Sequence, residues 1–265
     1  MNTEDLKNIK RWYREYTSDF LSDKTISFPV RLKISHIRRV VKEADMLARS
    51  IQLSEEDKVI ALTTAWLHDV GRFPQIRIYN NMNDRQTENH AILGLKTVDD
   101  LGVLNRLNAE DSGLIRTAIF NHNRLKIEDG LNARELLFCR LIRDADKLDI
   151  WKVMLESDRT ASASELSTVF GGLPELPEYS EAILNDMCHA RLADVTDMKT
   201  RNDFRLLMLT WVYDLSFTAS FRAVKERGYV DEFESNIPQT KEIQRAVEIV
   251  KNYAHHKANE CLSRD

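Results

Sequence analysis

Four histidines and two aspartates in the first part of this 265-residue chain occupy positions where a buried apolar side chain would be expected. Each lies on the inward line of a 3.6-residue repeat, where leucine, valine or alanine is usual. A lone inward histidine is more often a satisfied core residue. Together, however, six such groups in one core would be destabilising without a cation, because burying unpaired charge is costly. The six are His36, the adjacent pair His68 and Asp69, His90, His122 and Asp146.

The types of donor in this set indicate which ion it would bind. Imidazole and carboxylate ligands suit Mn, Fe, Co, Ni or Zn, whereas Mg matches so many nitrogen donors less well. Six side chains without a thiolate do not describe a closed structural zinc site. The set fits either one metal with further residues around it or two metals that share a bridging carboxylate, and the residues alone leave both open.

Helices must position these residues, because long 3.6-residue repeats dominate the chain. The 8 glycines and 5 prolines are too few for the turns of a many-stranded sheet, so we predict an all-α fold. His68 and Asp69 should lie in the last turn of a helix that Ser54 opens, with Gly71 as its C-terminal cap and Pro74 as a stop. The other predicted helices cover residues 3–22, 35–52 (with Ser35 as its cap), 84–101, 110–122, 133–149, 180–193, 202–227 and 239–262.

Three stretches are predicted to be non-helical: a polar turn at 23–30, a polar loop from Arg72 to Arg85, and a Ser-, Gly- and Pro-rich excursion at 157–180 that is a candidate lid. Gly94 lies one turn after His90, and a glycine inside a helix predicts that something packs closely against it.

Composition excludes some classes of protein. A formal net charge of -4 argues against a protein that coats nucleic acid polymers, which needs a basic surface. No stretch approaches the roughly 18 apolar residues of a membrane span. The acidic start of the chain and the three unpaired cysteines, Cys139, Cys188 and Cys261, predict a cytoplasmic protein with reduced thiols.

The ordered set of residues resembles the HD-domain superfamily of metal-dependent phosphohydrolases. The family pattern is H…HD…D, and its two-metal members extend it to H…HD…H…H…D. The resemblance covers about 30–155 and implies an HD-domain-like helical bundle with additional N- and C-terminal helices. We therefore expect a single α-helical domain over 1–265, with an HD core at about 30–155 and a C-terminal helical extension at about 156–265.

The resemblance also implies the roles of the residues. His36, His68, Asp69 and Asp146 would hold a first metal, and Asp69 would bridge to a second metal held by His90 and His122. The implied reaction is hydrolysis of a phosphomonoester, phosphodiester or anhydride of a nucleotide-like small molecule by a metal-activated hydroxide.

Two cations are candidates for neutralising the substrate phosphate beside Asp69. They are Arg72 and Lys147, although Lys147 could instead form a surface ion pair with Asp144 or Glu43. Asp144 and Asp149 are expected to cap or to form surface pairs.

The sequence leaves several alternatives open. His90 and His122 could contact phosphate in a one-metal site. The protein could be a nonhydrolytic nucleotide sensor, or a di-iron oxygenase on the same fold. Substrate identity and oligomeric state are left open.

Overall fold

The computed structural model describes residues 1–260, and all the regular structure in that range is helical. The all-α prediction is confirmed. The chain forms two compact units, Met1–Asp149 and the part from Ile150 onwards, and the long helix α7 (Ala133–Thr160) runs across the boundary. Among the described helices, none combines the length and the apolar content that crossing a membrane requires. Cys261 and the end of the last predicted helix lie outside the described residues.

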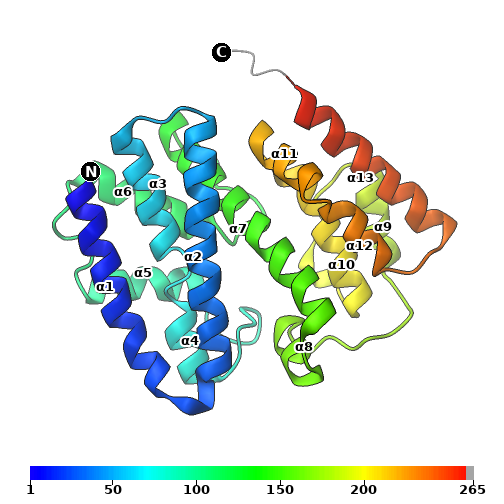
Figure 1. Cartoon of the computed structure of the whole chain (residues 1–265), viewed down its shortest axis with the longest axis horizontal. Coiled ribbons are helices and arrows are strands. Elements are labelled where there is room, and N and C mark those ends of the chain that lie inside the picture. The colour runs from blue at the N-terminus through cyan, green and yellow to red at the C-terminus, as the bar shows by residue number, and fades with distance from the viewer. Residues whose placement is uncertain (261–265) are drawn as a thin grey trace. The chain divides into compact units, whose positions relative to one another are not determined.

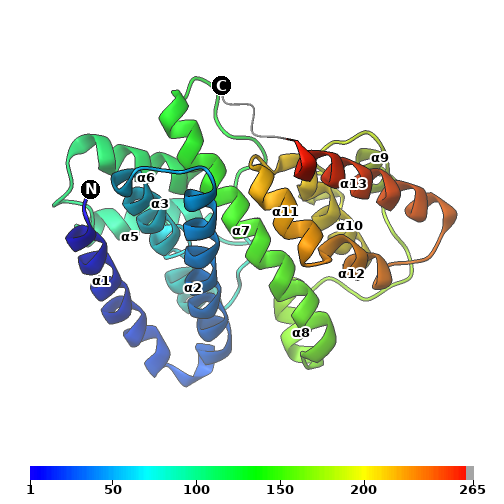
Figure 2. The same ribbon diagram turned by 45° about the horizontal axis from the view of Figure 1, so that its top comes forward.

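The first unit is a bundle in which α1, α2 and α3 lie side by side in both views (Figures 1 and 2). Helix α3 also packs against α6, and α5 packs against both α4 and α6. The elements of this unit, besides the start of α7, are α1 (Thr3–Ser22), a short 3-10 turn (Lys24–Ile26), α2 (Ser27–Ser50), α3 (Glu55–Leu67), α4 (Arg72–Tyr79), α5 (His90–Asp100) and α6 (Ala109–Asn121).

Side-chain caps set the starts of several of these helices. The Ser54 hydroxyl accepts from the backbone N–H of Asp57 at the start of α3, as predicted. The Asn89 side chain accepts from Ala91 and Ile92 and begins α5 at His90. The predicted start at residue 84 was therefore wrong, because the cap fixes the first turn six residues later.

Helix α2 begins at Ser27 rather than at residue 35, so Ser35 lies within the helix and does not cap it. The expected polar turn at 23–30 is limited to the 3-10 turn and its flanks. Pro29 lies in the first turn of α2, where its missing N–H has no helical partner to lose. Pro29 therefore marks the start of a helix.

The predicted loop from Arg72 to Arg85 is wrong in its first half, because residues 72–79 form α4. Gly71 is the N-cap of that helix in right-handed conformation and not a C-terminal cap, and Pro74 lies in its first turn. Asn80 caps the C-terminal end of the helix, and its φ of 46° is the left-handed conformation that asparagine tolerates.

Two glycines bring the turn after Asp69 against α5. A Cβ on Gly71 would lie 2.0 Å from the His90 carbonyl oxygen and 2.4 Å from the Gly94 nitrogen. A Cβ on Gly94 would lie 3.2 Å from the Gly71 nitrogen. The close packing predicted at Gly94 is confirmed, and its partner is the backbone that carries the His-Asp pair.

The second unit contains the end of α7 and a set of shorter helices. The predicted helix 202–227 is broken after Thr210, because residues 210–216 are rich in aromatic and β-branched residues, which are poor helix formers. The elements are α8 (Ala163–Val169), α9 (Glu181–Cys188), a 3-10 turn (Val195–Asp197), α10 (Arg201–Thr210), a 3-10 turn (Trp211–Asp214), α11 (Thr218–Glu226), α12 (Tyr229–Ser235) and α13 (Lys241–Asn259).

The predicted loop at 157–180 is partly helical, since α7 continues to Thr160 and α8 follows it. The remaining non-helical part is tied to α10. The Arg201 backbone N–H donates to the Pro174 carbonyl, and the Asn202 amide donates to the Leu176 carbonyl at 2.7 Å. These bonds describe a segment fastened within the second unit rather than a free lid.

Candidate metal centre

The ends of three helices in the first unit meet at the predicted ligands. His68 is the C-cap of α3, His122 is the C-cap of α6, and His90 is the first residue of α5. Helix ends are where the backbone turns, so a side chain there can point along the bundle interior instead of across it. His36 reaches the same region from the middle of α2, and Asp146 reaches it from α7.

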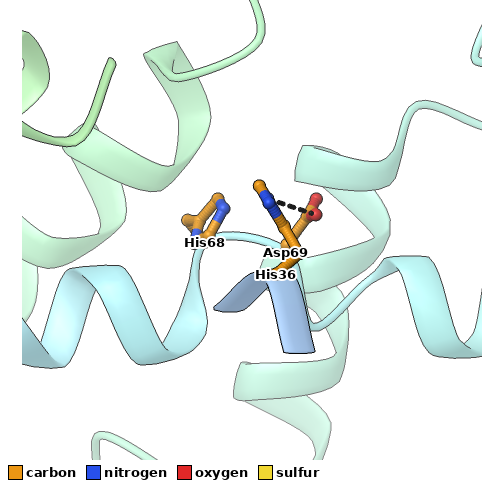
Figure 3. A group of neighbouring side chains, drawn as sticks. All are labelled: His36, His68 and Asp69. Carbon is orange, nitrogen blue, oxygen red and sulfur yellow. Dashed lines mark ion pairs between the residues drawn. The ribbon is translucent and has the colours of Figure 1, made fainter. Parts of the chain in front are cut away.

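A first group of ligand atoms consists of His36, His68 and Asp69, which we call the first triad. One donor atom from each lies within 4.8 Å of the others, and all three residues are buried. Figure 3 shows these side chains, with the ion pair between His36 and Asp69 dashed. Asp146 joins them, because its Oδ1 lies 3.0 Å from His36 Nε2 and 3.6 Å from His68 Nε2.

A second triad consists of Asp69, His90 and His122, again buried and within 4.8 Å. The Nε2 atoms of His90 and His122 are 2.9 Å apart. That separation suits two neighbouring ligands of one ion, each bound at about 2.0–2.1 Å. Asp69 belongs to both triads and turns a different oxygen to each. Its Oδ2 lies 3.5 Å from His36 Nε2, and its Oδ1 lies 3.2 Å from His90 Nε2.

The other ring nitrogen of each histidine already has a partner. The acceptors of the four Nδ1 atoms are Asp149 for His36 (2.7 Å), the Ala65 carbonyl for His68 (2.8 Å), Asp84 for His90 (2.6 Å) and the Ile119 carbonyl for His122 (2.6 Å). Because carbonyl and carboxylate oxygens only accept, each Nδ1 carries the proton and donates it. Nε2 is therefore the nitrogen that each ring turns to the centre, as a metal ligand requires.

Three atoms at this centre test whether an ion fits. His36 Nε2, His68 Nε2 and Asp146 Oδ1 are buried and have no hydrogen-bond partner. Buried polar atoms are nearly always satisfied, so three such atoms that face one another fit a shared cation. The residues present therefore fit a bound divalent metal.

A family model called HD domain matches residues 34–151, the segment that contains all six of these residues. The chain contains an HD domain. Proteins of the HD-domain family are generally metal-dependent hydrolases that bind divalent metals and act on small phosphorylated substrates. No curated protein and no solved structure matches the chain.

The electrostatics of the HD domain favour neutral imidazoles around charged carboxylates. Burial, together with His90 and His68, lowers the pKa of His122 to about 3. Burial and Arg72 likewise lower the pKa of His90, against the opposing pull of its carboxylate neighbours. Burial opposes ionisation of Asp69, but Lys33 and the facing histidines outweigh it and hold that pKa well below its usual range. Asp69 is therefore a carboxylate, and His122 is a free electron-pair donor at neutral pH.

His36 differs from these two histidines. Burial and Lys33 lower its pKa, but its close carboxylates, Asp146 and Asp149, overcome them and raise it. The same contacts hold the pKa of Asp146 well below its usual range against the effect of burial. His36 is therefore held between two carboxylates, one on each ring nitrogen.

Both predicted phosphate-binding cations are largely buried, but the structure places them differently. Arg72 lies beside the centre, with its Nε 3.4 Å from Asp69 Oδ1. Its Nη1 donates to Gln75, to the Met82 carbonyl and to Asp84. Lys147 is 7% exposed and interacts with other parts of the chain, so it is not a surface side chain.

Three further residues beside the metal centre were not predicted from the sequence. Lys33 donates to Asp69, and the outer carboxylates Asp84 and Asp149 orient His90 and His36. Asp149 was expected to cap or to pair at the surface, yet it is 1% exposed and also binds Arg39. The spacing held a signal, because Asp149 is three residues after Asp146 and shares its helix face.

Proposed function

We propose that the HD domain is a two-metal phosphohydrolase in which Asp69 bridges the ions. The observation that carries this proposal is the pair of triads that share one carboxylate, with a different oxygen turned to each. A single-metal site would leave His90 and His122 without a role as ligands. Here their Nε2 lone pairs also converge on Asp69, which supports a second ion.

His36, His68, Asp69 and Asp146 would hold the first ion, and Asp69, His90 and His122 the second. Divalent ions so placed supply a water of lowered pKa and neutralise the charge of a transferring phosphoryl group. The chain's own contribution is orientation, since every imidazole is fixed through its Nδ1. Arg72, fixed by three acceptors, would place a positive charge beside the phosphate.

Exposure around the centre supports a small substrate. The Asp146 side chain is 16% exposed, whereas His36, His68, Asp69, His90 and His122 are each 5% exposed or less. A centre that is buried to this extent admits a phosphate group at the end of a small molecule more readily than a polymer strand. We infer a phosphate ester or anhydride of a nucleotide-like molecule as the substrate class.

The test is hydrolysis by protein that has been stripped of metal and reloaded with Mn, Fe, Co, Ni, Zn or Mg. Substrates would be nucleoside mono-, di- and triphosphates and simple phosphodiesters. Asp69→Ala is the informative variant, and Asp129→Ala, at an exposed loop carboxylate, is its matched control. We expect turnover by the wild type and the control and none by Asp69→Ala.

Unchanged turnover in Asp69→Ala would contradict the proposal. Tight nucleotide binding without turnover in any metal would favour a nucleotide sensor. Oxygen consumption by the iron-loaded protein with a polyol or a phosphonate would favour an oxygenase.

A further inference from the structure

Lys33 occupies the side of Asp69 that the first triad would offer to an ion. Its Nζ lies 2.8 Å from Asp69 Oδ2, and this same oxygen is the one 3.5 Å from His36 Nε2. Lys33 lies on α2, one turn before His36, so both side chains approach the centre from the same helix. The ammonium group therefore takes a place that would otherwise suit a metal ion.

An ammonium and a divalent cation cannot both stay on that oxygen. Like charges a few ångströms apart in a poorly solvated site repel each other by several kcal/mol. The ion pair between Lys33 and Asp69 is thus an arrangement of the metal-free protein, in which it compensates a carboxylate that is only 3% exposed.

The surroundings determine which cation can leave. Arg72 is fixed by Gln75, the Met82 carbonyl and Asp84, as well as by its proximity to Asp69. The Lys33 side chain is 15% exposed. A lysine on a flexible four-carbon stem can swing toward solvent, whereas a guanidinium held by a fork of hydrogen bonds cannot.

The nearest outer carboxylate of the first triad is already engaged. Asp149 accepts from His36 and from two nitrogens of Arg39, at 2.6 and 3.0 Å. A phosphate that enters the centre would bring new oxygen acceptors to the partly exposed side, within reach of the displaced ammonium.

We propose that Lys33 is a displaceable cation that couples metal binding to phosphate binding. It neutralises Asp69 in the metal-free protein, a divalent ion displaces it from Oδ2, and the freed ammonium then pairs with the phosphate of the substrate. The inference rests on the proposed metal centre. It makes the two ligands bind cooperatively, since each favours the same position of Lys33.

Calorimetric titration of full-length, metal-stripped protein with Mn²⁺, with and without inorganic phosphate, tests this coupling without measuring turnover. The variants are Lys33→Met, which keeps the stem and removes the charge, and Lys33→Gln, a second neutral form in case the first folds poorly. Lys42→Met, at an exposed position on the same helix, is the matched control. Thermal unfolding would be followed for every variant.

In the wild type and in Lys42→Met, we expect phosphate to tighten Mn²⁺ binding by roughly five- to tenfold. In Lys33→Met and Lys33→Gln, Mn²⁺ alone should bind roughly tenfold more tightly than in the wild type, because no ammonium competes for Asp69. The effect of phosphate should fall below about twofold, since the coupling group is gone.

If the neutral variants match the wild type in both Mn²⁺ affinity and phosphate effect, the inference is overturned while the metal centre stands. If the wild type binds no Mn²⁺, the metal centre and the inference fail together.

Discussion

The two triads of the HD domain are built in the same way but from different parts of the chain. Each has one histidine at a helix C-terminus whose Nδ1 donates to a carbonyl three residues earlier, His68 to Ala65 and His122 to Ile119. Each has a second histidine oriented by an aspartate. In the first triad that aspartate is Asp149, which lies on the regular helix α7 and is 1% exposed.

In the second triad the orienting residue is Asp84, in the non-helical segment between α4 and α5. Its side chain is 24% exposed, and it is held by side chains from separate places, including Gln75 at 2.8 Å and Asn123 at 3.1 Å. A helix fixes its residues through its own backbone, whereas a loop carboxylate depends on each of these contacts. We therefore expect the second ion to bind more weakly and to be lost first.

Removing one histidine from each triad should have the largest effect. We expect His36→Ala and His122→Ala each to reduce kcat/KM for the preferred substrate by roughly a hundredfold or more, above the range for residues outside the ligand set. His36→Ala should also abolish binding of the tighter ion, whereas His122→Ala should spare it. Steady-state kinetics with calorimetric Mn²⁺ titration would measure both effects. Loss of the tighter ion in His122→Ala would contradict the assignment of that ion to the first triad.

Substitution of the outer carboxylates should have a smaller effect, confined to the metal affinity of one triad. Asp84→Asn should weaken only the second ion, and Asp149→Asn only the first, each by about 10- to 100-fold. The reason is that an amide no longer accepts the Nδ1 proton as strongly, so the ring loses its orientation. Two-site Mn²⁺ titrations would show which constant changes. Equal weakening of both ions by Asp84→Asn would mean that the triads do not act separately.

Gly71 tests the junction between the triads, because it lies two residues after Asp69 and touches the backbone of His90. A Cβ there meets backbone atoms at 2.0 Å, so Gly71→Ala should cost about 1–3 kcal/mol of unfolding free energy, the range for overpacking. It should also displace His90 from Asp69 and weaken the second ion more than the first.

Gly113→Ala is the control for Gly71→Ala. It lies in α6 with no atom within 4 Å of its added Cβ, and should stabilise by about 0.5–1 kcal/mol. Urea denaturation measures both variants. Equal changes in unfolding free energy in the two variants would contradict the close contact between Gly71 and the backbone of α5.

A further effect, on stability alone, concerns acidification of the protein without bound metal. The pKa of His122 is about 3 when folded, below its ordinary value of 6.5. The unfolded chain therefore takes up this proton first, and stability falls as the pH drops from about 6.5 toward 3. Between pH 7 and 5 the wild type should lose about 2 kcal/mol more than His122→Asn, from 1.36 kcal/mol per pKa unit. Identical urea midpoints at pH 5 and 7 in both would contradict this, and His255→Asn, at an exposed position, is the control.

The same contrast between helix and loop explains what could be predicted from the sequence. The inward repeats on α2, α3, α6 and α7 were strong enough to predict the helices that carry His36, His68, His122 and Asp146. The predicted start of α5 was wrong because the Asn89 cap is a local three-residue signal in a polar stretch. Helix α4 was missed because Gly71 and Pro74 are read equally well as a helix end or a helix start.

The residues whose roles were not predicted are those whose position depends on contacts with residues distant in sequence. Lys33 precedes the predicted helix start at 35, and nothing marks it until Asp69, 36 residues later, is placed beside it. Asp84 lies in a polar run with no periodicity, so only the folded arrangement of Arg72, Gln75 and Asn123 reveals its role.

The central claim is that Asp69 is shared between two ions. Elemental analysis of Mn²⁺-loaded, dialysed protein tests it most directly when the wild type is compared with His122→Ala. The two triads predict about two ions per chain in the wild type and about one in His122→Ala. A single ion in both proteins would contradict the shared carboxylate and reduce the centre to the first triad alone.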